Sequence, residues 1–145
     1  ALTRLSTYAM EKNVNVLVEN HGGLSSKASL LVEVMKGVGM DNCGTLPDFG
    51  HFCISEDDSG CVERYDRYKG VRELMPFAKA VSAKSNNFDS KGNERDIDYV
   101  KMLQIVKDAG YTGYIGVEYE GSELGEEAGI KATRDLMLKA AKQLS

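Results

Sequence analysis

The chain has 145 residues, of which 28% are charged, and it carries a formal net charge of −4. This length suffices for one domain with its own core. The acidic balance argues against nucleic acid or an anionic membrane surface as a partner, and no apolar stretch approaches the ~20 residues of a membrane-spanning helix.

The first part of the chain alternates between helical and extended patterns. Apolar residues at helical spacing predict a helix from about residue 2 to 9, so we expect the chain to continue upstream. A buried strand is predicted over 15–19. A helix follows over about 25–38, with Ser25 or Ser26 as its N-cap.

The middle of the chain repeats this pattern more weakly. A strand is predicted around residues 42–48, where Pro47 makes the strand end irregular. A polar loop is expected over 55–60. Helical periodicity then predicts a helix over about 65–75, and Pro76 closes it.

Two further strand and helix pairs complete the chain. Strands are predicted over 80–85 and 114–119. Asp96 is expected to open the helix between them, and the last helix begins at about residue 126. Four strand–helix units in succession predict an α/β fold with a parallel sheet, formed by a single domain over residues 1–145.

The cysteines are three in number, Cys43, Cys53 and Cys61, and their spacings match no zinc-binding pattern. We therefore expect three reduced thiols that pack as small apolar side chains. Because thiols stay reduced in the cytoplasm, we expect the protein to be cytoplasmic.

Polar residues recur where the predicted strands end. The first strand ends at Glu19, the second at Asp48, the third at Ser82 and Lys84, and the fourth at Glu118. The carboxyl ends of parallel strands share one edge, which is where α/β proteins place their chemistry. Three converging carboxylates repel one another unless a cation compensates, and oxygen ligands suit Mn²⁺ or Mg²⁺. The alternative is that each carboxylate is a solvated strand end.

Four stretches give the chain a family resemblance: VLVENHGG, GTLPDFGHF, YDRYKGVRELMPFAKAVSAKS and GYTGYIGVEYEG. They resemble the C-terminal half of the xylose-isomerase-like TIM barrels, the sugar-phosphate isomerase/epimerase superfamily that includes ketose 3-epimerases and inosose dehydratases. The resemblance implies four consecutive βα units, the last half of a (β/α)8 barrel, preceded by the tail of a helix.

The resemblance also implies roles for individual residues. Glu19, Asp48 and Glu118 match metal ligands, and the two glutamates match the residues that move protons. His51 matches a substrate-contacting histidine, and Lys84 matches a lysine that many relatives carry, so both are expected to contact oxygens of the substrate.

One position departs from the family pattern. Ser82 stands where the relatives have a histidine ligand, so the metal is expected to be bound weakly, with water, or not at all. His21 lies close to Glu19 in the sequence and is a candidate substitute ligand or substrate contact. A loop-packing role for His21 is an equal alternative.

These residues favour a metal-dependent sugar isomerase or epimerase that acts on a small sugar or sugar phosphate. Glu19 and Glu118 would act as base and acid through an enediolate. The alternative is a non-catalytic, self-associating fragment with a vestigial metal site. A nucleotide-binding sheet is disfavoured because neither common glycine-rich phosphate loop occurs. Because half a barrel has two open edges, we expect a homodimer.

Overall fold

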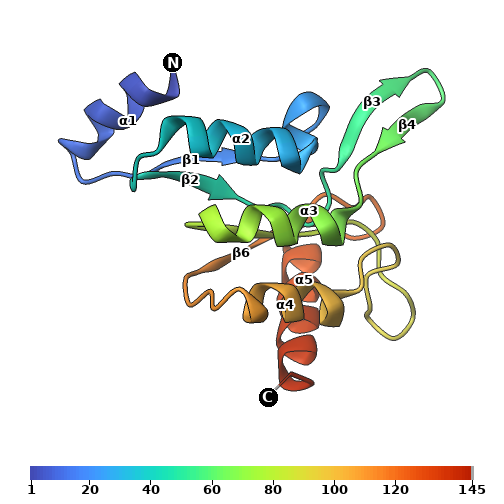
Figure 1. The fold of residues 1–145 in the computed structure, drawn as a ribbon. Coiled ribbons are helices and arrows are strands. Elements are labelled where there is room, and N and C mark those ends of the chain that lie inside the picture. Colours follow the sequence, from blue (N-terminus) through green and yellow to red (C-terminus); the bar gives the residue numbers. More distant parts are fainter. Residues whose placement is uncertain (145) are drawn as a thin grey trace.

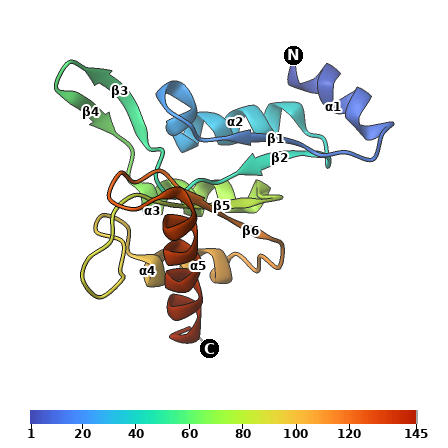
Figure 2. The same ribbon diagram turned by 180° about the vertical axis from the view of Figure 1, so that it is seen from behind.

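Four parallel strands form the centre of the protein in the computed structural model, which describes residues 1–144 (Figures 1 and 2). β1 (Val16–Glu19) pairs with β2 (Cys43–Leu46), and β5 (Val81–Ser85) pairs with β6 (Ile115–Tyr119). Both pairs are parallel, which confirms the α/β organisation predicted from the alternating pattern.

The two strand pairs are joined into one strand order by bridges between β2 and β5. Parallel bridges link Thr45 to Ala78 and Asp48 to Ser82. The amide of Ser82 donates to the carbonyl of Pro47 at 2.9 Å. The pairs β1-β2 and β5-β6 are two-stranded sheets, and these isolated bridges place them side by side in the order β1-β2-β5-β6. The β3–β4 hairpin, which lies between β2 and β5 in the chain, is outside this order.

Within residues 1–144, five α-helices accompany these strands: α1 (Leu2–Met10), α2 (Ala28–Val38), α3 (Arg67–Leu74), α4 (Tyr99–Asp108) and α5 (Glu126–Lys142). From α2 to α5, each helix contacts the next one along the chain. The larger apolar cluster lies between β5 and helices α3, α4 and α5, and the smaller one lies between α2, β2 and α3. Among residues 1–144, no helix combines the length and the apolar character needed to cross a membrane.

Two helix starts differ from the sequence-based expectation. α4 begins two residues later than predicted, because Asp98 rather than Asp96 is the N-cap and accepts a hydrogen bond from the amide of Lys101. Ser25 and Ser26 do not cap α2. They lie in a 3₁₀ turn over Gly23–Ser26, which redirects the chain after β1.

The polar loop predicted over 55–60 is wrong, because these residues form an antiparallel hairpin. β3 (Cys53–Asp57) pairs with β4 (Gly60–Arg64), and the hairpin projects away from the body of the protein in both views (Figures 1 and 2). Gly60 makes the turn with a φ of 106°.

A disulfide joins Cys53 to Cys61 across this hairpin, so the expectation of three reduced thiols is also wrong. Cys53 pairs with Arg64 and Cys61 pairs with Glu56 in the strand register, which is irregular near Cys53 and Ser55. The two cysteine Cα atoms nevertheless lie 5.8 Å apart, which the sequence spacing alone did not reveal. Cys43 is the free cysteine, and it is buried beside α2.

Candidate metal centre and active site

Three carboxylates meet at the carboxyl edge of the sheet, as predicted. Glu19 is the last residue of β1, Asp48 follows β2, and Glu118 lies in β6. Each offers a carboxylate oxygen, and these oxygens all lie within 4.8 Å of one another. Strands at opposite edges of the sheet therefore deliver side chains to one place.

Asp48 is the most enclosed of the three, with no exposed surface. Its Oδ1 accepts hydrogen bonds from the amides of Gly50 and His51, both at 2.8 Å. Its Oδ2 is buried and has no hydrogen-bond partner within residues 1–144. A buried carboxylate oxygen without a partner is costly, and a cation is the partner that its charge suits.

Asn20, which the sequence analysis did not single out, holds this part of the chain in place. Its amide nitrogen donates to the carbonyls of Asp48 at 3.0 Å and His51 at 3.1 Å. Its carbonyl oxygen accepts from the amide of Asp48 at 2.8 Å. The buried side chain of Asn20 thereby ties the end of β1 to the segment that follows β2.

Glu118 is surrounded by hydrogen-bond donors from β5. Ser82 Oγ donates to its Oε2 at 2.6 Å, and Lys84 Nζ contacts its Oε1 at 2.8 Å. Lys84 is 1% exposed and forms a second ion pair with Glu120 Oε2 at 2.7 Å. Ser82, which stands where the resemblance places a histidine, therefore hydrogen-bonds Glu118, one of the proposed metal-binding residues. Glu120 shares a strand face with Glu118, and this spacing was the signal that could have identified it.

The surroundings shift the pKa values of the carboxyl groups in different directions. Burial raises the pKa of Glu19, and the charges of Asp48 and Glu118 add to this effect. Burial also raises the pKa of Asp48. For Glu118, burial is outweighed by the hydrogen bonds from Lys84 and Ser82, so its pKa is lowered.

Two buried groups next to the cluster also have shifted pKa values. Burial opposes the charge on Lys84, but its hydrogen bonds to Glu118 and Glu120 prevail and raise its pKa. Lys84 therefore remains a cation. Tyr99, another residue not anticipated, donates to the backbone carbonyls of Ala83 at 3.1 Å and Lys84 at 2.8 Å, and burial raises the pKa of its hydroxyl.

The two histidines lie beside the carboxylates. Their rings meet edge to face with centroids 4.0 Å apart. His51 Nε2 lies 3.3 Å from Glu120 Oε2, and His51 Nδ1 lies 3.7 Å from Asp48 Oδ1. Both rings line a cavity of about 410 Å³ that opens toward the β3–β4 hairpin. His21 groups with His51 and Glu120 as possible metal donors rather than with the three carboxylates.

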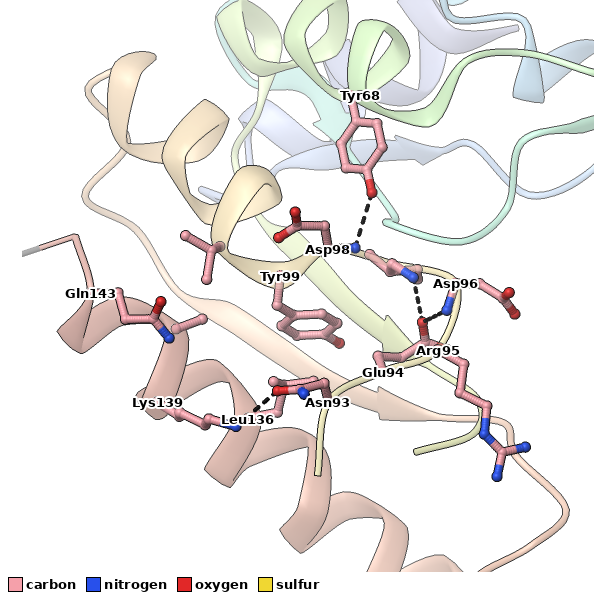
Figure 3. A pocket seen from close by; sticks show the side chains of 13 residues that line it. Tyr68, Asn93, Glu94, Arg95, Asp96, Asp98, Tyr99, Leu136, Lys139 and Gln143 are labelled. Carbon is pink, nitrogen blue, oxygen red and sulfur yellow. Dashed lines mark hydrogen bonds between the residues drawn. The ribbon is translucent and has the colours of Figure 1, made fainter. Parts of the chain in front are cut away.

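A separate pocket of about 380 Å³ lies between α4, α5 and the segment before α4 (Figure 3). Its polar groups pair with one another: Tyr68 Oη accepts from the amide of Asp98 at 3.0 Å, and Lys139 Nζ donates to Asn93 Oδ1 at 2.8 Å. None of the residues predicted to form the site lines this pocket. The chemistry predicted from the sequence therefore lies elsewhere.

The carboxylate cluster fits a divalent cation. It presents three carboxylate oxygen donors, and hard cations such as Mn²⁺ and Mg²⁺ prefer this donor set. Asp48 Oδ2, which has no hydrogen-bond partner among the described residues, is free to bind such an ion. Ser82 supplies a hydroxyl where an imidazole is expected, and both oxygens of Glu118 already accept hydrogen bonds. The residues present could hold a divalent ion, at a site where Lys84 already neutralises part of the charge.

Three solved structures with a similar fold are two sugar 3-epimerases and one 3-epimerase-like protein. A D-tagatose 3-epimerase-like protein superposes with a TM-score of 0.72 at 20% identity, over 97% of this chain and 52% of that one. An L-ribulose 3-epimerase gives 0.69 at 18% identity, over 99% and 54%. A D-psicose 3-epimerase from Clostridium cellulolyticum H10, solved with D-tagatose, gives 0.64 at 15% identity, over 97% and 52%.

These likenesses concern the fold, and the chain spans about half the length of each solved structure. Among curated proteins, the 3'-dehydrocarminate deglycosidase alpha subunit of Microbacterium sp is 40% identical over 48 residues, which are 33% of this chain and 14% of that subunit. The profile of the family described as xylose isomerase-like TIM barrel matches residues 1–140. The four strand–helix units are therefore half of an α/β barrel, and the chain belongs to the xylose isomerase-like TIM barrel family.

Proposed function

We propose that this chain carries the metal-binding half of a sugar isomerase or epimerase, which moves a proton at a carbon next to a carbonyl group. The observation that supports the proposal most is the convergence of carboxylate oxygens of Glu19, Asp48 and Glu118 within 4.8 Å, where Asp48 Oδ2 has no hydrogen-bond partner in the described part of the chain. A bound Mn²⁺ or Mg²⁺ would polarise the carbonyl and hydroxyl oxygens of the sugar.

The two glutamates are proposed to carry the proton. Transfer through an enediolate needs one carboxylate that accepts a proton and one carboxyl group that donates it. Glu19 is proposed as the base and Glu118 as the acid in one direction, and the roles exchange in the other. The hydrogen bonds from Lys84 and Ser82 fix the position of the Glu118 carboxylate beside the cluster.

The remaining predicted residues are proposed to bind the sugar. His51 and His21 line the cavity of about 410 Å³ and can donate to hydroxyl oxygens. His51 connects this cavity to the carboxylate cluster, because its Nδ1 lies 3.7 Å from Asp48 Oδ1. Lys84 is a buried cation that orients Glu118 and Glu120 through its two ion pairs. The substrate class proposed on this basis is a small sugar or sugar phosphate.

Solvent exchange tests this function directly. The 145-residue protein is incubated with Mn²⁺ and D-tagatose or D-psicose in deuterated water, and deuterium at the carbon next to the carbonyl is measured by NMR. Wild type should exchange this proton, and Glu118→Gln should not. Glu123→Gln is the matched control, because Glu123 pairs with Arg95 and lies outside the cluster.

The same experiment separates the two functions considered for this chain. A wild-type protein that binds Mn²⁺ but exchanges no proton contradicts catalysis by this chain and favours the alternative, a non-catalytic fragment with a vestigial metal site. Exchange that persists in Glu118→Gln contradicts the role assigned to Glu118.

We further propose that the half barrel, as one unit, forms a homodimer. β1 and β6 are the two outer strands of the order β1-β2-β5-β6, and no other described strand pairs with their outer edges. An open edge presents unpaired backbone groups that favour pairing with another strand. Sedimentation equilibrium should give twice the 15.9 kDa mass of the chain, and a folded monomer at micromolar concentration would contradict the proposal.

A cytoplasmic location also stays a proposal. It was inferred partly from reduced thiols, and the Cys53–Cys61 disulfide removes that part of the argument. Cell fractionation tests it: recovery of the protein in the soluble cytoplasmic fraction agrees with the proposal, and recovery outside the cytoplasm contradicts it.

A further inference from the structure

A second group of possible metal donors lies beside the carboxylate cluster and shares no residue with it. His21, His51 and Glu120 each offer a donor atom, and these atoms all lie within 4.8 Å of one another. They follow the ends of three different strands, β1, β2 and β6. The convergence is therefore a product of the tertiary fold and not of local sequence.

Hydrogen bonds of the backbone hold both histidines in position. The amide of His21 donates to Ser25 Oγ at 2.9 Å, within the turn that follows β1. The carbonyl of His51 accepts from Ser26 Oγ at 2.8 Å and from the Asn20 side chain at 3.1 Å. Because these contacts come from the same turn region, the two imidazoles are preorganised relative to each other.

The surroundings of His51 indicate which ring nitrogen is available to a metal. Its Nδ1 is buried, has no hydrogen-bond partner within residues 1–144, and lies 3.7 Å from Asp48 Oδ1. The other ring nitrogen, Nε2, lies 3.3 Å from Glu120 Oε2, so donor atoms of these two residues are already adjacent. Asp48 lies on the far side of the ring, and a carboxylate in that position commonly orients metal-binding imidazoles.

We propose that His21, His51 and Glu120 form a second divalent-cation site, which prefers zinc or cobalt to manganese or magnesium. Two imidazoles and one carboxylate, with water in the remaining position, form a donor set that zinc favours. Lys84 contacts Glu120 through Oε2, so Oε1 is the oxygen that the ion would bind. The all-oxygen cluster nearby suits harder cations, and the two sites therefore select different metals.

This inference does not rest on the proposed catalysis, because it concerns binding alone. It connects with that function at one point, since His21 and His51 are also the proposed sugar contacts. Zinc at this site would occupy both imidazoles and compete with the sugar.

The composition of the chain makes a specific test available. His21 and His51 are its two histidines, so an untagged protein gives imidazole C–H signals from these residues alone. Zn²⁺ is titrated into the 145-residue protein with excess Mg²⁺ present to fill the carboxylate cluster, and the imidazole signals are followed by NMR. Both signals should shift together and saturate at one equivalent of zinc added to the Mg²⁺-saturated protein, whereas further Mg²⁺ added in place of zinc should cause no further shift.

Variants identify the ligands. His21→Ala and Glu120→Gln should each weaken zinc binding by at least about tenfold. Glu19→Gln removes a carboxylate of the first cluster and should leave zinc affinity within about twofold. Circular dichroism checks that each variant folds. A zinc titration that moves one imidazole or neither, or a His21→Ala variant that binds zinc as wild type does, would overturn the proposal.

Discussion

Glu19 and Glu118 carry the same side chain at opposite edges of the sheet, yet their surroundings differ in charge. Glu118 accepts hydrogen bonds from Ser82 Oγ and Lys84 Nζ, and these hydrogen bonds lower its pKa. Glu19 faces Asp48 and Glu118 across the cluster, and burial together with these negative charges raises its pKa. The β6 side of the site already has a cation, and the β1 side lacks one. The difference indicates that an added cation acts mainly on Glu19 and Asp48.

Lys84→Met should reduce the difference between Glu118 and Glu19 more than any other change, because it removes the cation that pairs with Glu118 and Glu120. Loss of a buried ion-pair partner costs ~3–5 kcal/mol, and the partial exposure of Glu118 and Glu120 reduces the expected loss of unfolding free energy to about 2 kcal/mol. The pKa of Glu118 should rise as well. Urea unfolding and carboxyl NMR measure these two effects.

The matched control for this change is Lys131→Met. Lys131 pairs with Glu127 on the exposed face of α5, and both side chains are more than half exposed. Such a pair contributes little, so the unfolding free energy should change by less than about 0.5 kcal/mol. Equal losses in the two variants would contradict the structural role of Lys84.

Ser82→His should strengthen metal binding. It places an imidazole on β5 where Ser82 Oγ now contacts Glu118, and it restores the ligand type expected from the family resemblance. The affinity for Mn²⁺, measured by calorimetry, should rise on the order of tenfold. Ser55→His is the control, because it adds a histidine at an exposed position of the β3–β4 hairpin, away from β5. Unchanged affinity in Ser82→His would show that β5 does not face the metal.

Gly50→Ala should displace the side chain of Lys84 without removing its charge. A Cβ at residue 50 would lie 2.6 Å from Lys84 Cγ, so the lysine stem must move. Overpacking of this kind costs about 1 kcal/mol or more, and it should raise the pKa of Glu118 as Lys84→Met does. Gly37→Ala in α2, where no atom lies within 4 Å of the added Cβ, should be neutral or slightly stabilising. A neutral Gly50→Ala would mean that Lys84 is held less firmly than described.

The smallest expected effect is on the pH dependence of stability without metal. In the window between 4.5 and the raised pKa of Glu19, the folded protein binds more protons than the unfolded chain, so the free energy of unfolding falls as pH rises. Glu118 has the opposite sign: its contribution is present above 4.5 and is lost as pH falls through its lowered pKa.

Urea unfolding with a chelator, repeated across this pH range, measures both contributions. Glu19→Gln should gain stability relative to wild type as pH rises above 4.5, and Glu118→Gln should lose stability relative to wild type as pH rises toward 4.5 from below. The same trend in both variants would contradict the difference between the two edges of the site.

The sequence pattern predicted the parts of the protein that depend on periodicity. Apolar runs located the four strands, and the steps between strand ends predicted the convergence of Glu19, Asp48 and Glu118. What it did not reveal depends on contacts between distant residues. Nothing local to Asn20 indicates that it hydrogen-bonds Asp48, and the polar composition around Cys53 and Cys61 concealed a hairpin.

The charge distribution of the site was likewise only partly foreseen. Lys84 was expected to offset some of the negative charge, but its sharing between Glu118 and Glu120 appears only when β5 and β6 are paired in register. The grouping of His21 with Glu120 also requires the two edge strands to approach each other. These features result from the tertiary structure, which sequence spacing does not specify.

Titration of Mn²⁺ by calorimetry into wild type and Asp48→Asn tests most directly whether the three carboxylates bind a cation. Asparagine keeps an oxygen for the amides of Gly50 and His51 but removes the charge and the unpartnered Oδ2. Asp135→Asn, on exposed α5, is the control. We expect one equivalent of Mn²⁺ in wild type and in the control, and no measurable binding in Asp48→Asn. Equal binding by wild type and Asp48→Asn would contradict the assignment of this cluster as a metal site.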